Sequence, residues 1–178
     1  TKIITGNITQ EEYAPIAESC SALSSRPLTI NRKPSATVED ISFLAHQVNN
    51  LGFIVIDYLG LIRNNYGTKL YEKVTDTSNK LKALARQLGV PILCLAQLNR
   101  EVEGRQSGRP KISDLRDSGA IEQDADGILL LYRDMDDVPD DYPADLTCII
   151  GKNRHGRTGE INLKFFLPTG RIYAVMED

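Results

Sequence analysis

The feature that most constrains the fold of this chain is a strand, a long helix and a second strand that follow one another in its middle. Residues 53–57 (Phe-Ile-Val-Ile-Asp) form an apolar run without polar alternation, which is typical of a strand buried on both faces. Apolar residues keep helical spacing over residues 70–88, and Gly89 and Pro91 then end the helix. Residues 92–96 predict a second buried strand. Because such units are nearly always right-handed, with the helix covering one face of a parallel sheet, we expect an α/β fold.

Weaker patterns on either side of this unit predict further elements. Thr9 precedes acidic residues and a helical pattern, and Thr37 forms a capping box with Asp40 in front of another helix. The last third of the chain lacks helical signals, which predicts hairpins at the edge of the sheet. Outside the central unit, the runs predicted as strands are residues 27–31, 127–132, 146–150, 159–165 and 171–175. We expect residues 1–178 to form a single domain.

Composition narrows the class of protein. At 178 residues and 41% hydrophobic content the chain can bury one core, and no apolar run approaches the roughly 20 residues that span a bilayer, so we expect a cytoplasmic protein without membrane contact. The three cysteines are far apart and predict neither a disulfide framework nor a zinc site. A formal net charge of −3 argues against a protein that binds nucleic acid through a uniformly basic surface. Any contact with DNA is therefore expected to be local.

Two polar side chains follow the two central strands at the points where those strands end. Asp57 directly follows the first strand, and Gln97 follows the second. An acid at the carboxyl end of a parallel strand is a Walker B pattern, in which the carboxylate holds the Mg²⁺ of a bound nucleotide, and an amide beside it can sense the γ-phosphate. Open α/β sheets bind ligands at these strand ends. The pair favours a nucleotide site, although either residue alone also fits a strand that simply leaves the core.

Two segments gather positive charge. Residues 100–116 carry five basic side chains against three acids, a composition that suits either a loop tracking a phosphate backbone or a flexible solvated connector. Residues 151–157 crowd Lys152, Arg154 and Arg157 onto a tight turn between two predicted strands. Like charges this close repel, which favours an anion as their ligand. The alternative is a basic hairpin tip that keeps a sheet edge soluble.

One motif of nucleotide-binding proteins is missing from the chain. A phosphate-binding loop has the form GxxxxGK[ST], and the only Gly-Lys pair has Leu146 where the first glycine belongs and Asn153 where the hydroxyl belongs. Neither His46 nor His155 has partners that predict a hydrolase triad or a metal site. The chain therefore supplies a Walker B acid without a Walker A loop.

Several stretches together resemble the DnaB-type replicative DNA helicases, in the order in which that family has them, and the similarity covers essentially the whole chain. These stretches are residues 53–59, 78–86, 96–100, 113–126 and 151–154. The resemblance implies a RecA-like P-loop NTPase core, with a largely parallel central sheet flanked by helices and antiparallel hairpins at its edge. It also implies that the core is truncated on its N-terminal side, because the Walker A loop and the catalytic glutamate are absent.

The resemblance implies nucleotide-binding and catalytic roles for four residues. Asp57 would be the Walker B acid that binds Mg²⁺, and Gln97 would be the nucleotide-sensing glutamine. Lys152 and Arg154 match the pair that reaches the nucleotide of the neighbouring subunit, with the arginine finger supplied in trans. ATP and Mg²⁺ are the implied cofactors.

The resemblance also implies DNA contacts and partners. Arg116, Asp117 and Gly119 match the loop that grips DNA phosphates in the channel of the ring, with Asp117 where the family more usually has glutamate. Members of the family assemble as hexamers around single-stranded DNA. The resemblance further implies that primase and a helicase loader are partners.

The function expected from the sequence is that of part of an ATP-dependent hexameric helicase, which unwinds duplex DNA by moving along one strand. Without a phosphate-binding loop, the 178-residue chain alone is not expected to hydrolyse ATP. One alternative is a non-catalytic module that docks on a ring or a loader. A second alternative, a recombinase or circadian-clock ATPase with the same core, is disfavoured by residues 113–126 and by the turn that carries Lys152 and Arg154.

Overall fold

The structure is a computed structural model that describes residues 2–99, 102, 104–105, 108–115, 118–133 and 143–175. The chain divides into two units, Thr1–Lys33 and Pro34–Asp178. None of the helices in the described ranges combines the length and the hydrophobicity that a membrane span requires.

The first unit consists of two helices, α1 (Lys2–Thr5) and α2 (Gln10–Ser24). The second helix begins where the sequence predicts, because the backbone N–H of Thr9 donates to the Glu12 carboxylate at 2.9 Å. The Lys2 ammonium, 2.6 Å from that carboxylate, and the Thr9 amide lower the pKa of Glu12 to about 2. The prediction of a strand at residues 27–31 is wrong, since the structure has no strand there. A β-branched run becomes a strand only when another strand supplies hydrogen bonds.

The second unit begins with the predicted strand, helix and strand. Its elements are, in order, α3 (Val38–Gln47), β1 (Ile54–Ile56), the 3-10 helix η1 (Leu59–Leu61), α4 (Leu70–Leu88) and β2 (Ile92–Cys94). The two strands pair in parallel, with Val55 opposite Leu93. The long helix has the predicted bounds and ends at Gly89, whose φ of 67° lies in the left-handed region that glycine adopts without strain. The predicted unit is confirmed, with both strands shorter than the apolar runs that encode them.

Helices α3 and α4 cover one face of this two-stranded sheet. The residues buried between them are Val38, Ile56, Leu81 and Leu84, each at most 8% exposed. On the opposite face, Val55 and Leu93 are 56% and 45% exposed. The prediction that both strands are buried on both faces is therefore wrong for the part of the chain that the structure describes. An apolar run shows that a strand has no polar face, and it does not show how many layers pack on it.

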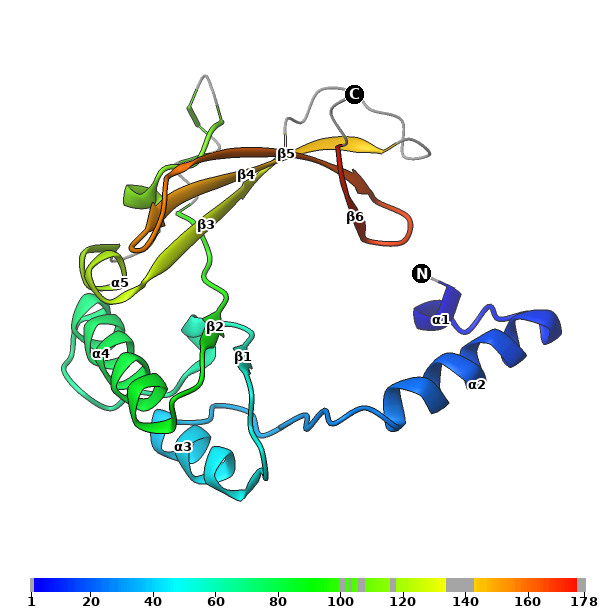
Figure 1. The fold of residues 1–178 in the computed structure, drawn as a ribbon, viewed down its shortest axis with the longest axis horizontal. Helices are drawn as coiled ribbons and strands as arrows, with labels where there is room; N and C mark the ends of the chain where they lie inside the picture. Colours follow the sequence, from blue (N-terminus) through cyan, green and yellow to red (C-terminus); the bar gives the residue numbers. More distant parts are fainter. Residues whose placement is uncertain are drawn as a thin grey trace. The chain divides into compact units, whose positions relative to one another are not determined.

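The remaining strands form a second, antiparallel sheet. The elements are the 3-10 helix η3 (Ile112–Asp114), α5 (Ser118–Asp124), β3 (Gly127–Tyr132), β4 (Ala144–Asn153), β5 (Gly159–Phe166) and β6 (Arg171–Ala174). The four strands pair in chain order, with α5 beside the start of β3 (Figure 1). The predicted antiparallel hairpins are confirmed, but among the described strands they form a sheet of their own and do not extend the edge of the parallel pair. The expected parallel arrangement holds only for β1 and β2 among the described strands, because runs of strand-forming residues do not specify which strands become neighbours.

Alternation along β3 gives a test of a second core, which is formed by the buried residues Leu115, Ile128 and Leu130. Leu130 is 4% exposed and packs with Leu115 and Ile128, whereas the adjacent Leu129 is 61% exposed on the other face. Replacing Leu130 with alanine is expected to lower the free energy of unfolding by about 2–4 kcal/mol, because it removes buried methyl groups and leaves a cavity. Leu129→Ala is the control and should change it by less than about 0.5 kcal/mol. Urea titration checks both, and equal losses would contradict the assigned burial.

Candidate functional site

Asp57 and Gln97 leave the two parallel strands at the same end. The backbone N–H of Leu95 donates to the Ile56 carbonyl at 2.9 Å, and that of Leu59 donates to the Leu95 carbonyl at 2.8 Å, so pairing continues beyond the strands themselves. Both polar side chains are exposed. Asp57 directly follows β1 and Gln97 lies three positions beyond the end of β2, so both come after the same end of the parallel pair, while their roles stay predictions.

The Asp57 carboxylate is available to a cation. It makes no ion pair or hydrogen bond with any residue that the structure describes. Within the described ranges there is also no group of three or more His, Cys, Asp or Glu side chains placed to hold a metal ion. Mg²⁺ is usually bound by one or two carboxylates together with nucleotide phosphates and water. The assignment of Asp57 as a Mg²⁺ ligand stays a prediction.

Backbone pairing joins Gln97 to the segment before α5. Leu98 forms an antiparallel bridge with Leu115, and the N–H of Asn99 donates to the Asp114 carbonyl at 2.8 Å. Leu115 is only 6% exposed and belongs to the second core. Backbone pairing therefore connects Leu98, the residue after Gln97, to Leu115, which precedes the predicted DNA segment.

The residues predicted to contact DNA lie around the start of α5. Arg116 and Asp117 fall outside the described residues. Gly119 lies in the first turn of the helix and is exposed, and a Cβ built there would meet nothing within 4 Å. The space beside Gly119 leaves room for a ligand to approach the backbone.

A buried ion pair holds the segment between Gln97 and α5. Asp114 is 3% exposed and accepts hydrogen bonds from the two terminal nitrogens of Arg105 at 2.7 and 2.5 Å, and from the Lys111 N–H at 2.7 Å. The Arg105 guanidinium and the Lys111 amide hold the pKa of Asp114 below its ordinary value. Arg109 likewise pairs with Glu160. Two of the cations that the sequence offered to a phosphate backbone are thus engaged by acids of this chain.

The lowered pKa of Asp114 predicts a pH dependence of stability. A carboxylate with a depressed folded pKa stabilises the fold above its unfolded pKa of about 4, and this contribution is lost as the pH falls through the folded value. Asp114→Asn should therefore lower the melting temperature at pH 7 by about 4 °C and flatten its decline at acidic pH. Thermal unfolding between pH 7 and pH 3 checks this. The control is Asp145→Asn, which removes an exposed acid paired with Lys164 at 2.8 Å. Parallel curves for the native chain and the Asp114 variant would contradict the prediction.

The cations of the turn between β4 and β5 dock on the carboxyl end of α5. Lys152 donates to the carbonyls of Glu122 and Gln123, the latter at 3.3 Å. Arg154 donates through Nη2 to the Gln123 carbonyl at 3.0 Å, and its Nε lies 3.2 Å from Asp126. The last carbonyls of a helix lack intrahelical partners and carry partial negative charge, so they attract cations. Lys152 and Arg154, which the sequence predicted to bind an anion, are therefore held in place by the last carbonyls of α5.

Asp126 links this turn to α4. Its carboxylate also pairs with Lys82 of α4 at 2.5 Å, and the nearby Asp124 accepts a hydrogen bond from Ser78 of the same helix at 2.7 Å. The Lys82 ammonium, assisted by the Arg154 charge, holds the pKa of Asp126 below its ordinary value. The sequence did not identify these partners, because spacing along α4 does not reveal which segment faces it.

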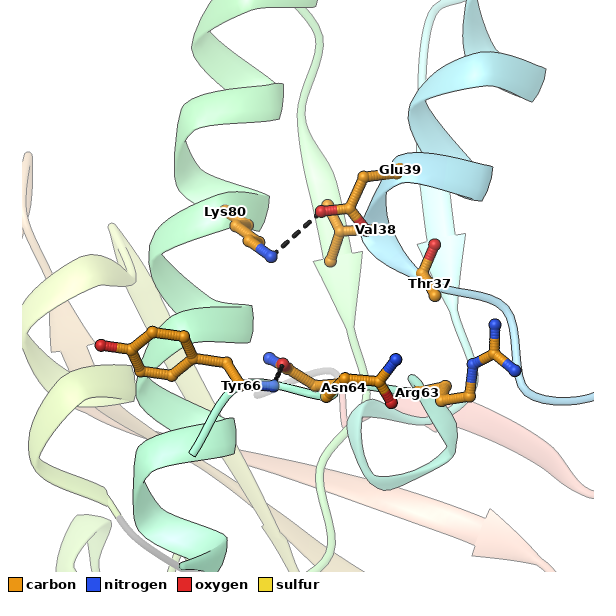
Figure 2. Close-up of a pocket in the computed structure, with 8 residues that line it drawn as sticks. Thr37, Val38, Glu39, Arg63, Asn64, Tyr66 and Lys80 are labelled. Carbon is orange, nitrogen blue, oxygen red and sulfur yellow. Dashed lines mark hydrogen bonds and ion pairs between the residues drawn. The ribbon is translucent and has the colours of Figure 1, made fainter. Parts of the chain in front are cut away.

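A hollow of about 310 Å³ lies away from these residues, between α3 and α4 (Figure 2). Glu39 and Lys80 meet there at 3.0 Å and join the two helices. Asn64 donates to the Asp76 carboxylate at 2.9 Å beside them. Because Asp57, Gln97, Lys152 and Arg154 do not line this hollow, it is not the predicted nucleotide site.

Comparison with known proteins identifies a family. Residues 1–173 match the family model for the DnaB-like helicase C-terminal domain. The chain is 41% identical over 172 residues to the replicative DNA helicase DnaB of Geobacillus stearothermophilus, and 39% identical over 167 residues to the replicative DNA helicase DnaC of Bacillus subtilis (strain 168). Each alignment covers 90% of this chain but 37% of the relative, so the chain spans little more than a third of these relatives.

Two solved structures resemble the fold. A solved ATPase domain superimposes with a TM-score of 0.87 at 31% identity, covering 98% of this chain and 65% of that one. A DnaB-like replicative helicase, solved with its interactions with primase, gives a TM-score of 0.84 at 31% identity, covering 95% of this chain and 42% of that one.

Proposed function

We infer the function from one premise, that this chain belongs to the family of DnaB-like helicase C-terminal domains. We propose that its residues form part of the motor of a hexameric replicative DNA helicase, which hydrolyses ATP to move along one DNA strand and separate the duplex. Both units of the chain would belong to one RecA-like P-loop NTPase domain with a central sheet. A longer subunit would supply the phosphate-binding loop that these 178 residues lack.

One observation carries this proposal: Asp57 and Gln97 leave adjacent parallel strands at the same end. The backbone of Leu95 is hydrogen-bonded to Ile56 before Asp57 and to Leu59 after it, which holds the ends of the two strands together. Nucleotide hydrolysis needs a group for the metal and a group that responds to the γ-phosphate, and the two strand ends supply one residue suited to each task. The Asp57 carboxylate, free of partners among the described residues, would hold Mg²⁺, and the exposed Gln97 amide would contact the γ-phosphate or its attacking water.

Lys152 and Arg154 would act on the nucleotide of a neighbouring subunit. A bound Mg²⁺ would offset charge on the phosphates, while these two cations would stabilise the charge that develops on the transferred phosphoryl group. Their attachment to α5 supports this role, because a cation held on a helix needs less reorganisation than a cation on a mobile loop.

Single-stranded DNA would be bound at the start of α5 by Arg116, Asp117 and Gly119. The backbone route from Leu98 to Leu115 supports coupling between this segment and Gln97. The similar helicase structure with its primase interactions supports primase as a partner, and hexamer formation and a loader are proposed from the family resemblance.

Strand displacement tests the proposal. The longer subunit containing this chain should separate forked DNA when ATP and Mg²⁺ are present and should fail to do so with a non-hydrolysable ATP analogue. Single-stranded DNA should also stimulate its ATPase activity. A subunit that enters rings but neither hydrolyses ATP nor separates strands would instead be a docking module, and the helicase proposal would be wrong.

The 178-residue chain alone gives a second prediction. Purified chain should release no phosphate from ATP above a no-protein blank, because it has no GxxxxGK[ST] loop to cradle the phosphates. A phosphate-release assay with and without Mg²⁺ checks this. Magnesium-dependent turnover by the isolated chain would contradict it.

A further inference from the structure

Arg154 is held at both its backbone and its side chain by one short stretch of chain. Its backbone N–H donates to the Asp126 carbonyl at 2.8 Å, and its Nε lies 3.2 Å from the Asp126 carboxylate. Its Nη2 donates to the Gln123 carbonyl at 3.0 Å. An arginine side chain has many rotamers, and three contacts to residues 123–126 select one of them.

The contacts leave part of the guanidinium free for a second molecule. They use Nε and Nη2, and Nη1 makes no hydrogen bond with any residue that the structure describes. The Arg154 side chain is 40% exposed. A purely structural arginine would have all of its guanidinium nitrogens engaged within the fold. Here Nε and Nη2 are engaged, and Nη1 is left for a ligand.

The support is anchored to the folded core. Lys82 of α4 pairs with the other oxygen of the Asp126 carboxylate, so this acid bridges Lys82 and Arg154. The residue before Lys82, Leu81, is 7% exposed and belongs to the core that α3 and α4 form with Ile56. Lys82 thus holds one oxygen of the Asp126 carboxylate while Arg154 lies at the other, and the turn between β4 and β5 lies beside α5 (Figure 1).

From this geometry we propose that Asp126 is a positioning residue, which holds Arg154 through Nε in the orientation that reaches the nucleotide of the neighbouring subunit. The proposal rests on the function proposed above. Asp126 itself would touch neither nucleotide nor DNA. Lys82 would hold Asp126 in place, and the Gln123 carbonyl would fix the plane of the guanidinium.

The same arrangement connects the finger to the predicted DNA segment. Helix α5 runs from Ser118 to Asp124, so Gly119 lies in its first turn and the Gln123 carbonyl in its last. Gly119 of the predicted DNA segment and the Gln123 carbonyl that supports Arg154 thus belong to the same short helix.

The test uses the assembled longer subunit and a double-mutant cycle. Asp126→Ala should lower the kcat of DNA-stimulated ATP hydrolysis about tenfold with KM for ATP within about twofold, because a displaced finger weakens only the transition state. Asp126→Asn removes the negative charge of the ion pair but keeps the size of the side chain, and should lose about threefold. In rings that already carry Arg154→Ala, adding Asp126→Ala should cause no further loss, since nothing remains to position.

A matched control separates positioning from general stability. Asp145→Ala removes an acid that pairs with Lys164 at the same sheet and should leave kcat unchanged. Equal losses from Asp126→Ala with and without Arg154 would make Asp126 a structural residue and overturn the proposal, as would unchanged or increased kcat. If Arg154→Ala itself had no effect, the failure would instead lie with the trans finger of the proposed function.

Discussion

Rings in which every subunit carries Arg154→Ala should lose ATP hydrolysis by at least about a hundredfold, because an arginine finger stabilises charge that develops only in the transition state. The loss should fall on kcat, with nucleotide affinity nearly unchanged. The side chain is 40% exposed and its partners lie at the surface, so the substitution should leave the fold intact. Steady-state ATPase assays with single-stranded DNA measure the effect.

Mixed rings decide whether the finger acts in trans. A subunit with Arg154→Ala keeps its own Asp57, and a subunit with Asp57→Asn keeps its finger. Each variant alone should be inactive, while an equal mixture should regain about a quarter of native ATP hydrolysis, because random assembly pairs an intact site with an intact finger at about one interface in four. No recovery in verified mixed rings would mean that Arg154 does not serve a neighbour.

The turn itself offers a control for the arginine variant. Arg157 is a third cation of the same turn, and no ion pair or side-chain hydrogen bond joins its guanidinium to a described residue. Arg157→Ala removes the same charge and should keep at least about half of native activity. A loss equal to that of Arg154→Ala would show that the turn acts through its net charge, with no dedicated finger.

The sequence predicted correctly those elements that are determined by residues close to one another in the chain. The α4 helix appears with its predicted bounds because amphipathic spacing, a glycine with φ of 67° and a following proline act within a few residues. The strand predicted at residues 27–31 does not form, because a strand depends on a partner that its own sequence does not specify. The family resemblance implied a largely parallel sheet, whereas the described strands pair in parallel only at β1 and β2, because an apolar run does not specify which strand becomes its neighbour.

The candidate site shows the same division. Asp57 and Gln97 could be placed together from sequence, since parallel neighbours end at one edge. The contacts that hold Arg154 could not be predicted, because the Gln123 carbonyl is a backbone group and because Lys82, which pairs with Asp126, lies 44 positions from it in the sequence. Asp114 was counted among the acids of a charged loop, yet it is 3% exposed and paired with Arg105. Charge counting along a segment does not show which charges neutralise one another within the fold.

Asp57→Asn tests the metal side of the site. In assembled rings it should lower ATP hydrolysis by about a hundredfold or more and shift the Mg²⁺ concentration for half activity upward, because a neutral amide oxygen is a weaker ligand for a hard cation than a carboxylate. The side chain is exposed and has no partner among the described residues, so the melting temperature should change by less than about 1 °C. Magnesium titrations of the ATPase, with Asp145→Asn as the control, measure this. Unchanged activity and magnesium dependence would make Asp57 only the point at which a strand leaves the core.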